Sequence, residues 1–280
     1  MSLAAVVGLL VKLCIFSTVF ALGLNATWKD VAYLLHKPGL FFRSLFALFA
    51  LTPLIAVLLV RVFPTPLPVE MAVLLMAVSA GAPVLPKKLL KLGGNPSYIY
   101  SLAVSMALLA IVTVPVSLAI LSAAVSTDIR VPPGQVAAAI SKAFLAPLLA
   151  GMVVRHFAPA LAGRAGEPLL KLTGIILLIL VLLIVATNFA AIVGIGLPSL
   201  GLIVLMTCAA LAAGHVLGGP DPGNRTTLAI ACATRFPGLA LLVASLNFPN
   251  AKPLPIVVAY VLISSLTVIP YMRWRKNTAA

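Results

Sequence analysis

The sequence predicts an all-α membrane protein, and three observations support that prediction. Of the 280 residues, 62% are hydrophobic and only 9% are charged, whereas about a quarter of the residues in a soluble domain are charged. Apolar runs of about 20 residues recur along the whole chain, and a helix of that length crosses the hydrocarbon core of a bilayer. Clusters of proline, glycine and charge separate the runs. We therefore expect residues 1–280 to form a single transmembrane domain.

About nine transmembrane helices follow from these breaks. The first run has no basic segment before it and no small-residue cleavage site after it, so we expect it to be retained as a helix. In chain order, the predicted spans are residues 4–24, 39–62, 69–92, 97–125, 135–157, 167–190, 198–217, 224–248 and 253–272.

The basic residues predict how the bundle is oriented. A net charge of +14 would suggest a nucleic-acid partner in a soluble protein, but here the basic residues lie mostly between apolar runs, so none is expected. Of the 19 Lys and Arg, thirteen fall on one side of the nine spans and three, Arg61, Arg130 and Lys252, on the other. Cytoplasmic loops carry the excess. We therefore expect a multi-pass inner (plasma) membrane protein with its N-terminus outside and its C-terminus in the cytoplasm.

Two of the spans are interrupted by proline and glycine. The third contains the segment Gly81-Ala82-Pro83-Val84-Leu85-Pro86, and the eighth contains Thr234-Arg235-Phe236-Pro237-Gly238. Proline removes a backbone donor and clashes with the carbonyl four residues earlier. In a membrane, the freed backbone groups are tolerated only where they line a cavity or contact protein. Both breaks are therefore candidate sites.

The two interrupted spans run in opposite directions through the predicted membrane. That is typical of inverted-topology repeats, in which discontinuous helices cross near the midplane and build the substrate site. We expect a first repeat of four spans over residues 1–125 and a second of five spans over residues 135–272, with the two broken helices crossing. Two unrelated proline kinks are the alternative, since proline is common in transmembrane helices.

The substrate site is expected where the breaks meet. Arg235 is its most informative residue, because it lies about ten residues inside its span, where an arginine costs at least about 2.5 kcal/mol. It either faces a cavity and binds an anionic substrate or holds the crossover together, or it is bonded to freed carbonyls. The predicted substrate-binding residues are Gly81, Pro83, Pro86, Lys87, Thr234, Arg235, Phe236 and Pro237.

Other kinds of site are not predicted. All five acids are expected in loops or at span ends, so a cation site or proton relay lacks its usual buried carboxylate. The three cysteines, expected as small core residues, lack metal-ligand spacing, and the three histidines have no acid or nucleophile at useful spacing. No catalytic residue, metal or cofactor is expected, and the chain is not predicted to be an enzyme.

Several weak motifs become informative through their order and spacing. They are residues 21–30, Lys37-Pro38, Thr52-Pro53, the break at 81–86 followed by Gly94-Asn95, and residues 225–241. In these features the chain resembles the bile acid:sodium symporter family, within the wider superfamily of bile, arsenite and riboflavin-type transporters. The resemblance implies a core domain that holds the crossing helices and a panel domain, here the first, fifth and sixth spans.

The chain departs from this family at the sodium ligands. The resemblance implies a Ser/Thr-Asn pair at the first crossover, a glutamine on the preceding span, and a glutamate and a Gln-Asn pair at the second. Arg235 falls at that last position, and we hypothesise that its charge, with or without that of Lys87, replaces the charge of sodium. The aligned residues here are Leu85-Pro86, Leu48, Ala231 and Arg235-Phe236.

The predicted function is secondary active transport of a small organic anion, independent of sodium. Its expected partners are that anion and the lipid bilayer. One alternative is a conventional sodium-coupled symporter whose sodium ligands are backbone carbonyls at the breaks. An alternative of another class is a membrane channel or a sensor, although a channel normally needs an oligomeric pore with a selectivity ring.

Overall fold

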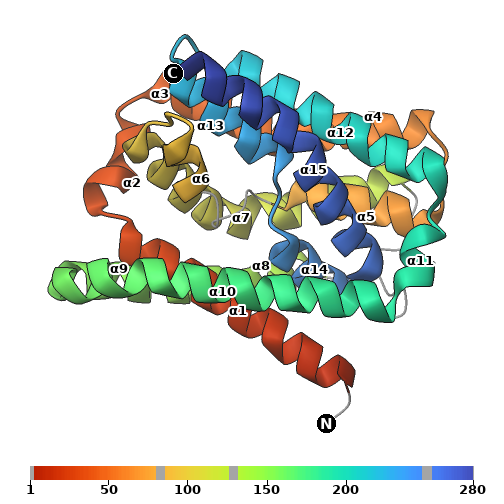
Figure 1. The fold of residues 1–280 in the computed structure, drawn as a ribbon, viewed down its shortest axis with the longest axis horizontal. Helices are drawn as coiled ribbons and strands as arrows, with labels where there is room; N and C mark the ends of the chain where they lie inside the picture. Colours follow the sequence, from red (N-terminus) through yellow and green to blue (C-terminus); the bar gives the residue numbers. More distant parts are fainter. Residues whose placement is uncertain (1–2, 80–85, 126–131, 248–253, 280) are drawn as a thin grey trace.

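A computed structural model describes residues 3–79, 86–125, 132–247 and 254–279. In these ranges every regular element is a helix, arranged as shown in Figure 1. The elements are α1 (Leu3–Asn25), α2 (Trp28–Leu35), α3 (Pro38–Leu45), η1 (Phe46–Leu51), α4 (Thr52–Val62), α5 (Leu67–Val78), α6 (Pro86–Lys91), α7 (Pro96–Val125), α8 (Pro133–Ile140), η2 (Ser141–Leu145), α9 (Ala146–Phe157), α10 (Pro159–Thr187), α11 (Phe189–Val193), α12 (Gly196–Leu217), α13 (Pro222–Ala233), α14 (Pro237–Asn247) and α15 (Leu254–Ala279).

Seven helical segments are long and apolar enough to cross a membrane. They overlap seven of the nine predicted spans, which confirms an all-α membrane protein with many spans. The other two predicted spans are divided into α5 with α6 and α13 with α14, each shorter than a bilayer needs, so the total of nine stays a prediction. The seven segments are Gly8–Asn25, Pro38–Val62, Pro96–Ile120, Pro133–Phe157, Pro159–Thr187, Gly196–Leu217 and Pro255–Thr278.

The sequence places two boundaries wrongly. The sixth span does not start at residue 167, because α10 begins at Pro159, a first-turn position where proline loses no helical hydrogen bond, and continues through Pro168. Glu167 therefore lies inside a helix. The expected loop over 25–38 contains α2, whose first turn is held by a capping box: the Thr27 hydroxyl accepts from the Asp30 N–H, and the Asp30 carboxylate accepts from the Thr27 N–H.

Two predicted spans contain a π-helical turn, which the sequence analysis does not predict. The segment η1 lies just before Thr52-Pro53, and η2 just before Ala146-Pro147. A π-helical turn inserts one residue into an α-helix and leaves backbone groups without their usual partners. Proline has no N–H, so the carbonyls before it lose a further hydrogen-bond donor.

The helices pack as two groups. We call α1, α8, η2, α9 and α10 the panel helices, and α3, η1, α4, α5, α7 and α12 to α15 the core helices. Within the first group, α1 packs closely on both α9 and α10. These three helices lie along the lower edge of Figure 1, α4, α12 and α13 lie along the upper edge, and α15 runs obliquely from the upper edge toward α14. The panel helices cover the first, fifth and sixth predicted spans, and a panel domain formed by them stays a prediction.

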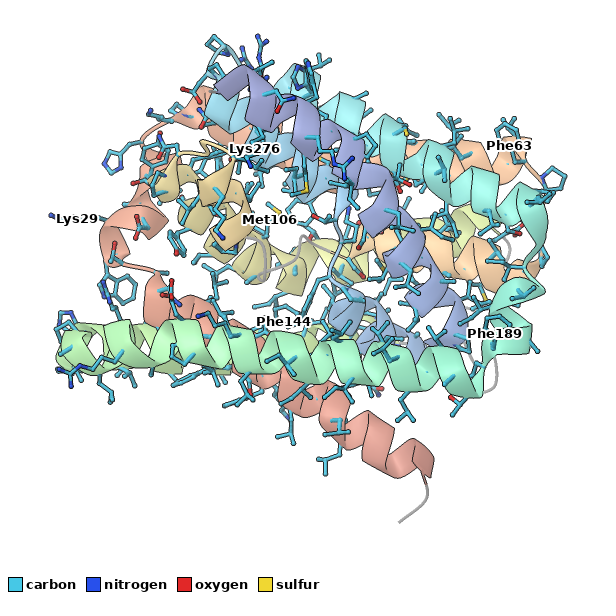
Figure 2. All side chains as sticks on the ribbon, in the orientation of Figure 1. Lys29, Phe63, Met106, Phe144, Phe189 and Lys276 are labelled. Carbon is cyan, nitrogen blue, oxygen red and sulfur yellow. The ribbon has the colours of Figure 1, made fainter. Side chains whose placement is uncertain are left out.

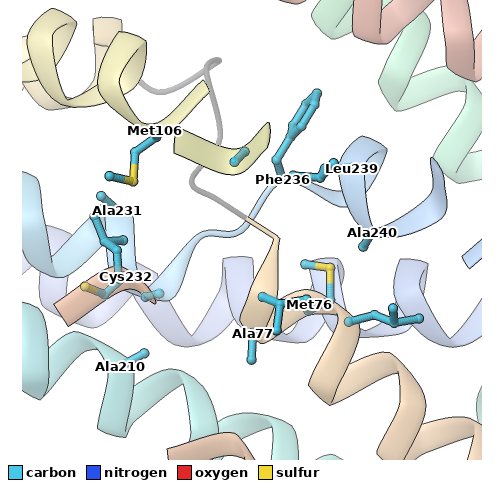
Figure 3. Close-up of a cluster of buried hydrophobic side chains, with 14 of the residues drawn as sticks. Met76, Ala77, Met106, Ala210, Ala231, Cys232, Phe236, Leu239 and Ala240 are labelled. Atoms are coloured by element: carbon cyan, nitrogen blue, oxygen red, sulfur yellow. The ribbon is translucent and has the colours of Figure 1, made fainter. Parts of the chain in front are cut away.

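The two broken helices end their first halves in the same way. Ser79 after α5 and Thr234 after α13 are both extended, and each hydroxyl donates to the carbonyl four residues earlier. The second halves, α6 and α14, begin at Pro86 and Pro237. Helix α5 packs against α14, and Figure 3 shows Met76 of α5 with Phe236 and Leu239 in one buried apolar cluster.

Candidate functional site

Arg235 is a buried charged residue at the second break, with 4% of its surface exposed. Its Nε donates to the Cys232 carbonyl at 3.0 Å, and Nη1 and Nη2 both donate to the Leu48 carbonyl at 3.2 Å. The guanidinium thus joins the end of α13 to η1. This geometry matches the interpretation in which the arginine is bonded to freed carbonyls, and its contact with a substrate stays a prediction.

The Leu48 carbonyl can accept a hydrogen bond from Arg235 because the backbone near Pro53 gives it no N–H donor. In an α-helix this oxygen would accept the Thr52 N–H, but at the π-helical turn that N–H donates to Ala47 instead. The next residue, Pro53, has no N–H to offer. The Thr52 hydroxyl also donates to the Ala47 carbonyl, at 2.6 Å. The Leu48 oxygen therefore lacks its usual helical donor and accepts the guanidinium of Arg235.

The guanidinium lies near the middle of a membrane-length helical segment. Leu48 belongs to the 25-residue segment Pro38–Val62, and it lies about 15 Å along the helix from the start of that segment. Of the four carboxylates in the part of the chain that the structure describes, Asp30 and Glu70 lie in first turns, Asp221 is the N-cap of α13, and Glu167 lies on the panel helix α10. Carbonyl dipoles thus stabilise the charge of Arg235 without cancelling it.

Phe236 contacts the panel helices. Its ring, 4% exposed, packs edge-on against Phe144 of η2, with ring centroids 5.5 Å apart and planes at 88°. Figure 2 shows Phe144 between α10 and the core helices. Neighbouring residues of one break therefore contact the two π-helical turns, Arg235 through the Leu48 carbonyl of η1 and Phe236 through Phe144 of η2.

An apolar cavity of about 50 Å³ lies between the panel and core helices. Ligand sites usually measure about 300–1,000 Å³, so a solute would need these two groups of helices to separate. Polar atoms are almost absent from its wall, since the Thr18 hydroxyl is bonded to the Cys14 carbonyl at 2.6 Å. The lining residues are Val11, Cys14, Ile15 and Thr18 of α1, Leu177, Leu180, Val181 and Ile184 of α10, Phe236 to Gly238 and Leu241 at the start of α14, and Val258 and Val261 of α15.

The structure brings together some of the predicted site residues. Phe236 and Pro237 line the cavity, whereas Arg235 points away from it toward η1. Thr234 is partly buried, and its hydroxyl donates a hydrogen bond to the Ile230 carbonyl.

The first break is described less completely. Pro86 is buried at the start of α6. Gly81, Pro83 and the side chain of Lys87 lie outside the described residues.

Exposure in the structure differs among the polar and sulfur-containing residues of the spans. Lys12 and Lys142, which fall inside predicted spans, have exposed side chains on the panel helices. Cys208 is exposed on α12, although Cys14 and Cys232 are buried as expected. Two contacts of the site were not predicted from the sequence: the packing of Phe144 on Phe236 and the hydrogen bonds from Arg235 to the Leu48 carbonyl. The two Xaa-Pro pairs after the π-helical turns were the available signal, because each removes a helical donor.

Comparison with known proteins agrees with this arrangement. Residues 12–195 match the model of the Sodium Bile acid symporter family, while no curated protein matches the chain. The match includes η1, the second half of α1 and the other panel helices and ends before α13, so Arg235 lies beyond it. Because the matched region is more than half of the chain, the protein belongs to the sodium bile acid symporter family, whose members are transporters.

Proposed function

We propose that the protein is a sodium-independent secondary transporter of a small organic anion. One observation carries the proposal: a guanidinium is buried at mid-membrane depth at the second break and donates to the Leu48 carbonyl. Family membership supports transport of a small molecule across a bilayer. The position of the fixed positive charge supports the two finer statements, that the substrate is an anion and that sodium is not required.

Arg235 argues against a bound sodium ion at the second break. Leu48 stands where the family resemblance places a glutamine ligand, and the carbonyl of Leu48 is already used by the guanidinium. A sodium ion within about 4 Å of that charge would be repelled by about 4 kcal/mol at an effective dielectric constant of 20. The same charge attracts an anion.

The packing supports movement of the core helices against the panel helices. Within the panel, Gly23 of α1 and Gly151 of α9 bring two backbones into direct contact, so these helices move together. Between the groups, two contacts at the second break use side chains, Ile15 against Gly238 and Phe144 against Phe236. Side chains can change rotamer as the surfaces slide, whereas interlocked backbones cannot.

An inverted repeat and a defined orientation complete the proposal. The matching ends of α5 and α13 support a four-span repeat over 1–125 and a five-span repeat over 135–272. Figure 2 shows Lys29 and Lys276 at one end of the molecule, and Phe63 and Phe189 at the other. Because basic residues gather on the cytoplasmic side, we assign that first end to the cytoplasm, which puts the N-terminus outside.

The cavity wall favours an anion with an apolar body. Its aliphatic side chains offer almost no hydrogen bonds, so they would contact hydrocarbon while the charged group lies toward the crossover. A suitable test panel contains labelled monovalent anions with rigid apolar bodies, such as cholate and taurocholate, and small polar ones, such as acetate and lactate.

Uptake into proteoliposomes tests the proposal. We expect at least one anion of the panel to be transported at the same rate with sodium or potassium outside. Arg235→Gln should slow uptake strongly, and Lys142→Gln, which removes an exposed basic residue from the panel helices, should leave it intact. Transport by Arg235→Gln at the rate of the original protein would remove the arginine from the mechanism.

The second candidate is a conventional sodium-coupled symporter, which membership of this family favours. It predicts that uptake stops when sodium is removed and returns when sodium is added. That outcome would contradict sodium independence while leaving anion transport intact.

A further inference from the structure

The partners of Arg235 tie its charge to the core helices. The guanidinium donates to the Cys232 carbonyl of α13 and the Leu48 carbonyl of η1. Helix α13 packs on α12, α15 and η1, all of which are core helices. If the core moves against the panel, the guanidinium travels with it.

Among the residues that the structure describes, the guanidinium of Arg235 bonds to carbonyl groups and to no acid. Asp221, at the opposite end of the first half of this broken helix, lies about 20 Å from Arg235 by helical rise. Glu70 is in the first turn of α5, about 13 Å along that helix from Ser79. Both carbonyl partners are neutral peptide groups, so within the described residues the charge of Arg235 stays uncancelled at this level of the core.

We propose that Arg235 is the voltage-sensing charge of the transport cycle: the empty core moves as a cation, and the core loaded with a monovalent anion moves as a neutral body. This inference rests on the proposed function. In the proposed cycle, movement of the empty core is the step that responds to membrane potential. An interior-negative potential draws the empty core toward the cytoplasm, so it favours net export of the anion and leaves one-for-one exchange of anions unaffected.

The size of the effect follows from the distance that the charge travels. Moving one elementary charge through the whole of a 100 mV field changes an equilibrium about 50-fold, and through half of it about sevenfold. Net efflux of a preloaded anion should rise by an amount in this range when the vesicle interior becomes about 100 mV negative.

The experiment uses the full-length protein in proteoliposomes, with potassium gradients and valinomycin setting the potential. The probe is the anion of the panel above that gives the largest flux. For the original protein, exchange of labelled for unlabelled anion should be the same at zero and at interior-negative potential, while net efflux accelerates. Equal voltage dependence of exchange and net efflux would overturn the proposal, and this comparison needs no variant.

Substitutions at Arg235 test whether this residue carries the charge that moves in the field. In Arg235→Gln, any remaining exchange should become voltage-dependent, because the loaded core now carries the charge of the anion. Arg235→Lys should keep the pattern of the original protein, as should Lys142→Gln on the panel. An Arg235→Gln exchange that stays insensitive to voltage would contradict the assignment.

Currents without substrate separate this inference from the proposed function. A voltage step applied to the substrate-free protein should move charge in the original protein and in Lys142→Gln, but not in Arg235→Gln. If no anion of the panel is transported by any form, the proposed function fails, and these currents still decide whether Arg235 moves in the field.

Discussion

The contact between α1 and α9 leaves no room for a side chain at Gly151. A Cβ added there would lie 2.3 Å from the Phe20 carbonyl oxygen and 2.9 Å from Gly23 Cα. These are backbone atoms, which cannot rotate away. To restore an ordinary contact of about 3.4 Å, the two helices would have to separate by about 1 Å.

The cost of Gly151→Ala follows from that separation. Overpacking of a tight contact costs about 1–3 kcal/mol. In a membrane, close packing at small residues is itself a main driving force for helix association, so separation removes favourable contacts as well. The better helix propensity of alanine returns at most about 1 kcal/mol. We expect the free energy of unfolding to fall by about 1–2 kcal/mol, or several degrees in melting temperature.

Thermal melting in detergent, followed by size-exclusion chromatography, measures this effect. The matched control is Gly174→Ala in α10, where an added Cβ meets no atom within 4 Å. The control should melt at the temperature of the original protein or slightly above it. If Gly151→Ala and Gly174→Ala melt at the same temperature, the close backbone contact that defines the panel helices is not present.

Three further substitutions test local contacts. Tyr98→Phe removes the buried 2.8 Å hydrogen bond to the Ser44 hydroxyl and should lower the unfolding free energy by about 1 kcal/mol in chemical denaturation; an unchanged midpoint would contradict this. Asp30→Ala removes the capping box of α2 and should cost about 0.5–2 kcal/mol locally, seen as faster amide exchange in α2 but not in α7. Pro53→Ala supplies an N–H that competes with Arg235 for the freed carbonyls of η1, so uptake should fall while the protein still folds; full uptake would show that the break at Pro53 is dispensable.

Much of the fold could be predicted from hydrophobic length. Each membrane-length helix coincides with an apolar run, because a span must satisfy its own backbone and present apolar side chains to lipid. The start of α10 was missed because Pro159 and Pro168 give the same signal in sequence, although only Pro159 occupies a first turn. The π-helical turns were missed because no side-chain periodicity marks one inserted residue.

The candidate site was predictable only in part. The position of Arg235 at a proline break indicated a buried charge, which the structure shows to be 4% exposed. Its partner could not be predicted, because a backbone carbonyl 187 residues away in sequence carries no signature of its own. Only the pair Thr52-Pro53 pointed to η1, since proline leaves earlier carbonyls without a donor.

Binding of radioactive sodium to the purified protein shows whether Arg235 takes the place of the ion. We propose that the guanidinium of Arg235 stands where the family resemblance places sodium ligands, and that it already uses the Leu48 carbonyl. We therefore expect no saturable sodium binding by the original protein, under conditions in which a sodium-coupled family member run in parallel binds the ion. Saturable binding that unlabelled sodium displaces and potassium does not would contradict this proposal.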